Sequence, residues 1–321
     1  MNYIVLDLEW NQPQIDDSYR VDNLPFEIIE IGAVKLDDNR EFVSYFSEMI
    51  KPQVYKKLNN IIHDIVKLDI EDFESKDTFE LVIKRFFDWC GSDYIFCTWG
   101  AMDLTELQRN MDYFKVEGYI DKPIKYYDIQ KIFSLEHFGK KQMQSLESII
   151  DYFKLEKEDT FHRAYTDAKY TSLIFQKLDM KFVESNYSID CYHNPKSKDE
   201  TIFLKYDKYS KYISEEFLSK EEIMNDIDIK SIICYKCDSS VEIKVDWFCS
   251  NPKIYCCIAQ CKEHGLMKGK VRIKKSNTGK MYAIKTVNSI DENGYKLIHD
   301  RQQLIRAKRK AKRIRRKNDT N

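Results

Sequence analysis

The pattern of apolar and polar positions in the first half of the chain alternates between strand and helix signatures. Apolar runs at residues 3–9, 27–36 and 41–50 predict three consecutive strands that pair as an antiparallel meander. The pattern then predicts helices at 56–65 and 77–90, a strand at 94–98, a helix at 103–115, a short strand near 125–128 and further helices to about residue 181. Antiparallel strands followed by alternating helices and strands indicate an α/β fold, with a mixed sheet covered by helices on both faces.

Two carboxylates interrupt the first apolar run. Asp7 and Glu9 are two residues apart, so a strand places both side chains on the same face. Like charges at that spacing repel each other unless a cation lies between them, and oxygen ligands suit Mg²⁺ or Mn²⁺. The pair therefore predicts a divalent metal site. The alternative is that one acid simply points to solvent at the end of the strand.

Two later segments carry further candidate groups. Asp103 follows a strand and a Gly turn and opens a helix, although Asp103 and Glu106 also match a capping box. Asp167 lies on an amphipathic helix with the apolar stripe Ala164, Ala168, Thr171, Phe175 and Leu178. Five residues turn a helix by about 140°, so His162 can share a site with Asp167 only from the loop before that helix. A solvated loop histidine is the alternative.

Taken in order, Asp7-x-Glu9, Asp103 and His162-x4-Asp167 resemble the DEDDh exonucleases of the DnaQ-like family. The resemblance covers about 180 residues and includes the second strand, 27–33, and the helix at 145–153. The tyrosine class of this family would need Tyr at position 163, which is Arg here, so the histidine class fits. The segment 98–103 is similar to the subgroup of histone-mRNA and small-RNA trimming exonucleases, which favours RNA over DNA.

The resemblance implies a five-stranded RNase H-like sheet and a 3′ to 5′ exonuclease that releases nucleoside 5′-monophosphates, with single-stranded RNA as the favoured substrate. Asp7, Glu9, Asp103 and Asp167 would hold two Mg²⁺ or Mn²⁺ ions, a metal pair suited to in-line displacement at a phosphodiester. His162 would act as general base toward the attacking water. A DNA repair or proofreading exonuclease and a non-catalytic nucleic-acid or ribosome-binding adaptor remain alternatives.

Two tryptophans are candidates for contact with the terminal base. Trp10 follows Glu9 directly, and Trp99 lies shortly before Asp103. Stacking of a base on an aromatic ring contributes about 1–3 kcal/mol. Burial in the core is the alternative for both.

Length and charge distribution set the outer organisation. A chain of 321 residues predicts about two domains, with residues 1–181 as the exonuclease domain and 182–230 as a charged connector with a local helix around 214–226. Lys and Arg total 52 against 53 Asp and Glu, but ten cations lie in 301–317, which leaves a net charge of −11 elsewhere. An acidic body does not attract polyphosphate by its net charge, so metals and local basic patches must do so.

The chain shows neither an N-terminal signal peptide nor an apolar run of about 18 residues. We therefore expect a cytoplasmic protein without membrane contact.

Cysteines mark a second domain at 231–290. Six of the nine lie between Cys234 and Cys261, and the chain offers Cys234-x2-Cys237 and Cys261-x2-His264. Clustered thiolates and an imidazole in a cytoplasmic protein indicate one tetrahedral Zn²⁺ rather than disulfides. With apolar residues alternating around them, these pairs resemble a zinc ribbon. Cys257 could replace His264 as the fourth ligand, and free buried cysteines are the remaining alternative.

The last segment, 291–321, is predicted to be a basic arm. The ten positive charges in residues 301–317 should repel one another, although the residue types favour a helix. Such an arm can bind phosphates without sequence preference and tether the enzyme to nucleic acid or to a ribonucleoprotein. An arm that only adds solubility is the alternative.

Overall fold

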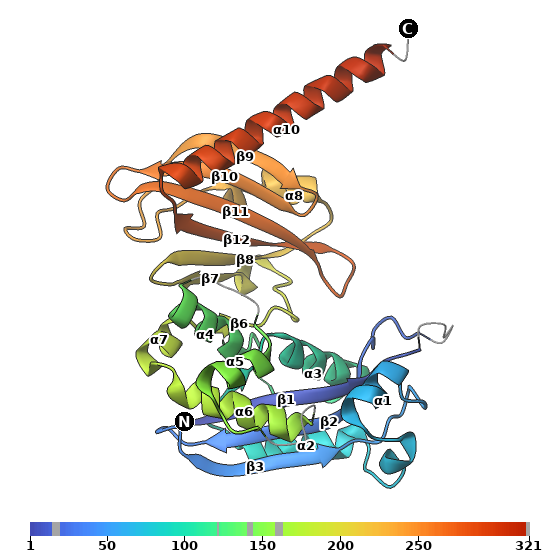
Figure 1. The fold of residues 1–321 in the computed structure, drawn as a ribbon. Coiled ribbons are helices and arrows are strands. Elements are labelled where there is room, and N and C mark those ends of the chain that lie inside the picture. The colour runs from blue at the N-terminus through green and yellow to red at the C-terminus, as the bar shows by residue number, and fades with distance from the viewer. Residues whose placement is uncertain (15–19, 121, 140–143, 158–162, 319–321) are drawn as a thin grey trace. The chain divides into compact units, whose positions relative to one another are not determined.

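The computed structural model describes residues 1–14, 20–120, 122–139, 144–157 and 163–318. The chain forms two compact units, Met1–Tyr192 and His193–Asn321 (Figure 1). Among the described helices, none combines the length and the apolar character needed to cross a membrane.

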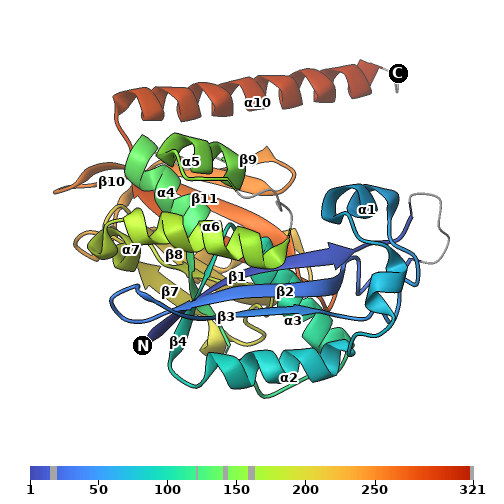
Figure 2. The ribbon, with the colours of Figure 1, turned by 60° about the horizontal axis from the view of Figure 1, so that its bottom comes forward.

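The first unit is built on a mixed sheet (Figure 2). Its strands are β1 (Asn2–Asn11), β2 (Glu27–Leu36), β3 (Phe42–Met49), β4 (Tyr94–Thr98), β5 (Lys125–Asp128) and β6 (Ser188–Ile189). Its α-helices are α1 (Asn60–Val66), α2 (Phe79–Cys90), α3 (Met102–Tyr113), α4 (Ile129–Phe138), α5 (Leu146–Phe153), α6 (Ala164–Lys177) and α7 (Met180–Ser185), and a 3-10 helix spans Ile70–Phe73.

The strand order is β3-β2-β1-β4-β5-β6. β1 is antiparallel to β2 and parallel to β4, which fits the predicted mixed sheet. The RNase H-like α/β fold is confirmed, with one difference. β6 adds a sixth strand antiparallel to β5, and its two residues are too few to leave a periodic signal in the sequence.

Side-chain alternation along β1 builds a core on each face of the sheet. Ile4 and Leu6 pack with α2 and α3, whereas Tyr3 and Val5 pack with α4, α5 and α6. Full burial of one such aliphatic side chain contributes about 1.5–3 kcal/mol. Asp7 continues the odd-numbered series, so β1 directs it toward the face that α6 covers.

Helix α1 begins at Asn60, four residues later than the pattern predicts. The buried carboxylate of Glu27 accepts backbone N–H groups from Gln53 (2.5 Å), Val54 (2.9 Å) and Tyr55 (2.7 Å). These bonds use the N–H groups of three consecutive residues, which lie in a bent segment without regular secondary structure. The helix then starts where Asn59 provides an N-cap.

The second unit is a separate β-rich domain, as predicted. Its strands are β7 (Ile202–Lys205), β8 (Tyr209–Phe217), β9 (Glu242–Asn251), β10 (Ile254–Cys261), β11 (Gly265–Lys275) and β12 (Met281–Ser289). Its helices are α8 (Lys220–Asn225), α9 (Ile227–Lys230) and α10 (Glu292–Asn318), with a 3-10 helix at Lys198–Glu200. The strands form one antiparallel sheet in the order β7-β8-β12-β11-β10-β9.

The structure differs from the expected connector at 182–230. Its first residues belong to α7 and β6 of the first unit, and β7 and β8 join the sheet of the second. The helix expected at 214–226 is strand as far as Phe217, and α8 starts after Ser219, which caps it. Pairing of β8 with β12, about 70 residues further on, overrides the local polar pattern.

The C-terminal segment is helical, but only its end projects as an arm. Tyr295, Ile298 and Ile305 of α10 pack on the apolar patch that Val245, Phe248, Cys256 and Ile258 form on the sheet. The buried Gln302 donates to the carbonyl oxygen of Asp246 over 3.2 Å. The segment 291–305 is therefore part of the domain.

Candidate functional site

Three carboxylates meet beside the central strand. One oxygen each from Asp7, Glu9 and Asp167 lies within 4.8 Å of the others. Asp7 and Glu9 come from β1, where they pair with Gly32 and Glu30 of β2, and Asp167 lies in the first turn of α6. All three side chains are half-buried. The strand spacing and the start of α6 thus bring together residues 158 positions apart.

Asp103 lies next to this group. Its buried carboxylate accepts a hydrogen bond from the backbone N–H of Leu8, the residue between Asp7 and Glu9. The predicted alternative for Asp103, a capping box, is not what forms. Ala101 is the N-cap of α3, and Glu106 is paired with Arg109 at 2.7 Å. Helix α3 therefore presents Asp103 to β1, the strand that carries Asp7 and Glu9.

The electrostatics of the site are those of crowded acids. Burial is the main cause that raises the pKa of Asp7 well above its usual value, and the charges of Asp103 and Glu9 raise it further. Burial and then the charge of Asp167 raise the pKa of Glu9 to about 8, and burial raises that of Asp103 to about 7. A divalent cation would remove this repulsion, and carboxylate oxygens are the ligands that Mg²⁺ and Mn²⁺ prefer.

A close approach of backbones positions Asp167. A Cβ atom built on Gly32 would lie 2.0 Å from the carbonyl carbon of Ala164 and 2.0 Å from the backbone nitrogen of Tyr165. Gly32 pairs with Asp7, so the missing side chain allows α6 to rest directly on the strand next to the acids. Sequence reasoning did not identify this role, although a Gly inside a strand is a known signal of close backbone approach.

An ion pair fixes the start of the same helix. Arg163, the N-cap residue of α6, donates from Nε to the Glu30 carboxylate at 3.0 Å and 3.2 Å and from a terminal nitrogen at 3.0 Å. Glu30 is buried and pairs across the sheet with Glu9. The bidentate contact holds the segment next to position 162 against β2. Neither residue was a sequence candidate, because their contact depends on the register of β1 with β2.

Of the remaining candidates of this site, the structure describes the two tryptophans but not the histidine. His162 lies outside the described residues. Trp10 is half-buried, contacts Phe26 with ring centroids 5.6 Å apart, and packs against the core on the α2 and α3 side. Trp99 is half-buried and donates from Nε1 to the carbonyl oxygen of Gln144 over 3.3 Å. Both contacts match the core alternative, and contact with substrate stays a prediction.

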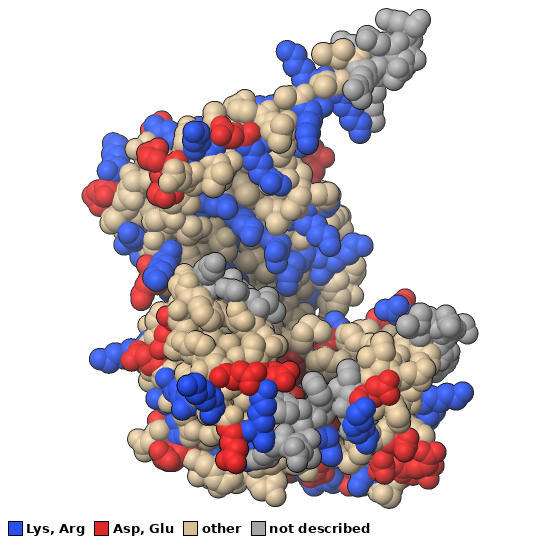
Figure 3. All heavy atoms as spheres, viewed as in Figure 1, with Lys and Arg blue, Asp and Glu red and all other residues tan. Residues whose placement is uncertain are grey.

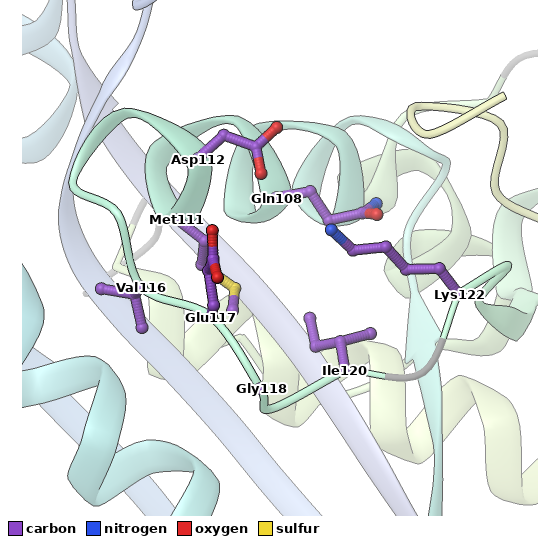
Figure 4. A pocket seen from close by; sticks show the side chains of 8 residues that line it. All are labelled: Gln108, Met111, Asp112, Val116, Glu117, Gly118, Ile120 and Lys122. Carbon is purple, nitrogen blue, oxygen red and sulfur yellow. The ribbon is translucent and has the colours of Figure 1, made fainter. Parts of the chain in front are cut away.

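A separate pocket in the first unit is formed by α3 and the loop that follows it (Figure 4). It is lined by Gln108 and Asp112 at the C-terminal end of α3 and by Glu117 and Lys122 from the loop that follows. None of the four carboxylates belongs to its lining.

The second unit contains a cluster of three cysteines and one histidine. Ligand atoms of Cys234, Cys237, Cys261 and His264 all lie within 4.8 Å of one another. Nδ1 of His264 is 3.6 Å from Sγ of Cys234 and 3.7 Å from Sγ of Cys261, and Sγ of Cys237 is 3.7 Å from Sγ of Cys261. The first two cysteines lie in a turn before β9, and the other pair lies at the turn between β10 and β11.

The two cysteines of the first pair differ in their pKa. Burial raises the pKa of Cys234 above its usual value. Hydrogen bonds with Ser239 lower the pKa of Cys237 to about 6, which favours the thiolate that binds metal. Cys257, the alternative fourth ligand, is not in the group. It lies in the hydrophobic core, and burial raises its pKa to about 12.

The chain is similar to the nuclease domain of 3′hExo, a DEDDh family member bound to rAMP, with 18% identity, a TM-score of 0.49, and coverage of 59% of this chain and 96% of that one. It is also similar to S. pombe Pop2p in a form with Mg²⁺ and Mn²⁺ bound, with 15% identity, a TM-score of 0.41 and coverage of 55% and 81%.

A third likeness is to E. coli ExoI in a zinc-bound complex with single-stranded DNA, with 11% identity, a TM-score of 0.45 and coverage of 57% and 42%. No curated protein sequence matches the chain. All three TM-scores lie below 0.5, so the assignment depends on the family model. The RNase_T exonuclease model matches residues 4–175, which is more than half of the chain, and this range contains all four carboxylates. The chain therefore belongs to this exonuclease family.

Proposed function

We propose that the chain is a metal-dependent 3′ to 5′ exonuclease that releases nucleoside 5′-monophosphates from nucleic-acid 3′ ends, with single-stranded RNA as the favoured substrate. The observation that carries the proposal is the meeting of Asp7, Glu9 and Asp167, with Asp103 beside them, in a chain of an exonuclease family. The similarity of residues 98–103 to RNA-trimming exonucleases favours RNA.

Asp7, Glu9, Asp103 and Asp167 would hold two Mg²⁺ or Mn²⁺ ions. The donor set fits hard divalent cations, because it consists of carboxylates whose mutual repulsion raises their pKa values. When bound, such ions lower the pKa of a bound water and offset the charge that develops during phosphodiester displacement. The protein contributes the fixed placement of the four acids on β1, α3 and α6.

His162 would accept the proton of the attacking water. An imidazole titrates near neutral pH, so it can take up this proton and release it to solvent in each cycle. Trp10 and Trp99 would contact the terminal base, which adds affinity through stacking.

The decisive experiment is a time course on matched labelled RNA and DNA strands, with Mg²⁺, Mn²⁺ or a chelator. We expect shortening from the 3′ end with nucleoside 5′-monophosphates as products, a faster rate on RNA, and no product with the chelator. Faster digestion of DNA would support the repair or proofreading alternative. Absence of digestion with either metal, together with retained binding, would support the non-catalytic adaptor.

We further propose that Cys234, Cys237, Cys261 and His264 bind one Zn²⁺. Three thiolates and one imidazole form a ligand set common in structural zinc sites. The ion would join the turn before β9 to the turn between β10 and β11 and contribute to the stability of the second unit.

Intact-protein mass spectrometry under native conditions should find one zinc ion per chain. His264→Ala should lose the ion and lower the melting temperature, because only three ligands remain. Cys257→Ser tests the alternative ligand set and should keep the zinc. A chain without zinc at any stoichiometry, or loss of the ion in Cys257→Ser alone, contradicts this assignment.

The end of α10 would act as a nucleic-acid or ribonucleoprotein tether in the cytoplasm. Its cations have no acidic neighbours in 301–317, and each phosphate contact would release counterions.

A further inference from the structure

One face of the second sheet carries a row of cations. Side chains of a strand alternate between faces, so Lys268, Lys270, Arg272 and Lys274 of β11 project together. Register extends the row across two strands, because Lys270 pairs with Thr286 of β12 and Thr286 pairs with Lys211 of β8. We call these five cations the basic face.

The apolar residues on the opposite side of β11 fix the side of the sheet to which the cations point. Met267, Val271 and Ile273 are buried in the core of the second unit. A slip of β11 by one residue would exchange that core with the lysines, so burial fixes the basic face toward the other side of the sheet.

The cations of the basic face are accessible and lack acidic partners. Arg272 and Lys274 are exposed, whereas Lys211, Lys268 and Lys270 are half-buried. No ion pair joins any of the five to an acid in the part of the chain that the structure describes. Burial, together with the charges of Arg272 and Lys268, lowers the pKa of Lys270. The cations of the basic face therefore repel one another, and a bound polyanion would reduce this repulsion.

Helix α10 borders the basic face without covering it. Its apolar residues pack on Cys256 and Ile258 of β10 and reach only Leu266, at the start of β11, on the same face. Figure 3 shows blue side chains gathered across the second unit in the view of Figure 1, where β11, β12 and β8 are visible below α10. Arg301 of α10 lies at this border, because its charge acts on Cys256 together with the charges of Lys268 and Lys270.

The spacing and composition of the row fit a single-stranded polyphosphate. Alternate residues of a strand are about 6.6–6.8 Å apart, so successive cations can follow an extended backbone. Tyr209 of β8 lies on the same face, because it pairs with Asn288, which pairs with Lys268. Proteins that bind single strands without sequence preference combine such cations with aromatic rings on which bases stack.

We propose that the basic face binds the phosphate backbone of single-stranded RNA and thereby holds substrate on the enzyme while the exonuclease unit removes its 3′ end. This proposal rests on the proposed function and adds a second substrate contact, independent of the carboxylates. Two linked contacts raise the effective concentration of substrate, which matters most for long strands.

The test is a triple variant, Lys268→Gln, Lys270→Gln and Arg272→Gln, made in the full chain. Binding of a labelled long oligouridine, measured without added Mg²⁺ or Mn²⁺ and without a chelator so that the zinc site is kept, should weaken at least about tenfold. Each phosphate contact adds about 0.7 to the slope of log affinity against log salt. Loss of three contacts should make that slope shallower by about 2. Hydrolysis of a nitrophenyl ester of a nucleoside 5′-phosphate should be unchanged.

The matched control is Lys208→Gln, Lys275→Gln and Lys280→Gln. It removes the same charge from exposed positions of the second unit that lie off the basic face. It should bind the RNA within about twofold of the natural chain, because contact and not net charge is proposed to matter. A truncation after Arg306 keeps the packed part of α10 and measures the contribution of the arm separately.

Equal loss of affinity in the two triple variants, or unchanged affinity and salt slope in the first, would overturn the proposal. Binding to phosphatidylserine vesicles but not to RNA would assign the face to a membrane surface and also overturn it. Failure of the proposed function gives a different result, because then the natural chain would not hydrolyse the nitrophenyl ester, whatever its affinity for RNA.

Discussion

Asp7→Asn is expected to lower the rate of nucleotide release by about a thousandfold or more, because loss of a metal-binding carboxylate removes several kcal/mol of transition-state stabilisation. Asp7 is central to the cluster, since Asp103, Glu9 and Asp167 all act on its pKa. Initial rates on labelled RNA, measured over a range of Mg²⁺ and Mn²⁺ concentrations, give the size of the effect. Undiminished digestion would reject Asp7 as a ligand.

The same variant should be more stable than the natural chain when metal is absent. Folding raises the pKa of Glu9 to about 8 and that of Asp103 to about 7, so the folded protein binds more protons than the unfolded one between pH 5 and 8. The stability of the metal-free protein must therefore fall as pH rises through this range. Asp7→Asn removes one of the repelling charges and should melt at a higher temperature at pH 8.

Added Mg²⁺ should raise the melting temperature of the natural chain, because the ion binds only the folded state, and it should raise that of Asp7→Asn much less. Asp88→Asn, at an exposed position of α2, is the control and should change neither activity nor the response to metal. His162→Ala should abolish activity but keep the response to metal, which distinguishes the proposed base from the proposed ligands.

The parts of the site that follow local rules could be predicted from the sequence. Asp7 and Glu9 share a face because of strand alternation, and the apolar stripe of α6 fixes the side on which Asp167 lies. Both rules require only a few neighbouring residues. The motif order then supplied the link between these distant segments, and the family model agrees with it.

The parts that depend on distant pairing could not be predicted. The contact of Arg163 with Glu30 needs both the start of α6 and the register of β2 against β1. The sequence of β7 and β8 indicates a polar connector, because β12, the strand with which β8 pairs, lies further along the chain. The packing of α10 could not be predicted either. Its few apolar residues are spread among cations, and their role as packing contacts depends on the surface that β9 and β10 form.

Gly32→Ala is expected to reduce the rate of nucleotide release by about a hundredfold while every proposed ligand and the proposed base remain in place. A Cβ on Gly32 cannot coexist with the backbone of Ala164 and Tyr165 at 2.0 Å, so α6 must move away from β2 by an ångström or more. Asp167 moves with the helix, and a misplacement of about 1 Å in a catalytic site can cost about a hundredfold in rate. The overpacking should also lower the free energy of unfolding by about 1–3 kcal/mol.

Stability alone does not explain such a loss if the control behaves as expected. Gly91→Ala introduces a methyl group at a positive φ of 80°, where nothing lies within 4 Å of the new atom. It should cost about 1–3 kcal/mol of stability through backbone strain, because Gly91 combines this φ with a ψ of −158°, a conformation that residues other than Gly rarely adopt, and leave the rate per folded molecule unchanged. The metal requirement separates the two variants further, because Gly32→Ala should need a higher Mg²⁺ concentration for half-maximal rate and Gly91→Ala should not. Full activity of Gly32→Ala at the same Mg²⁺ concentration would show that the position of α6 against β2 does not set the geometry of the acids.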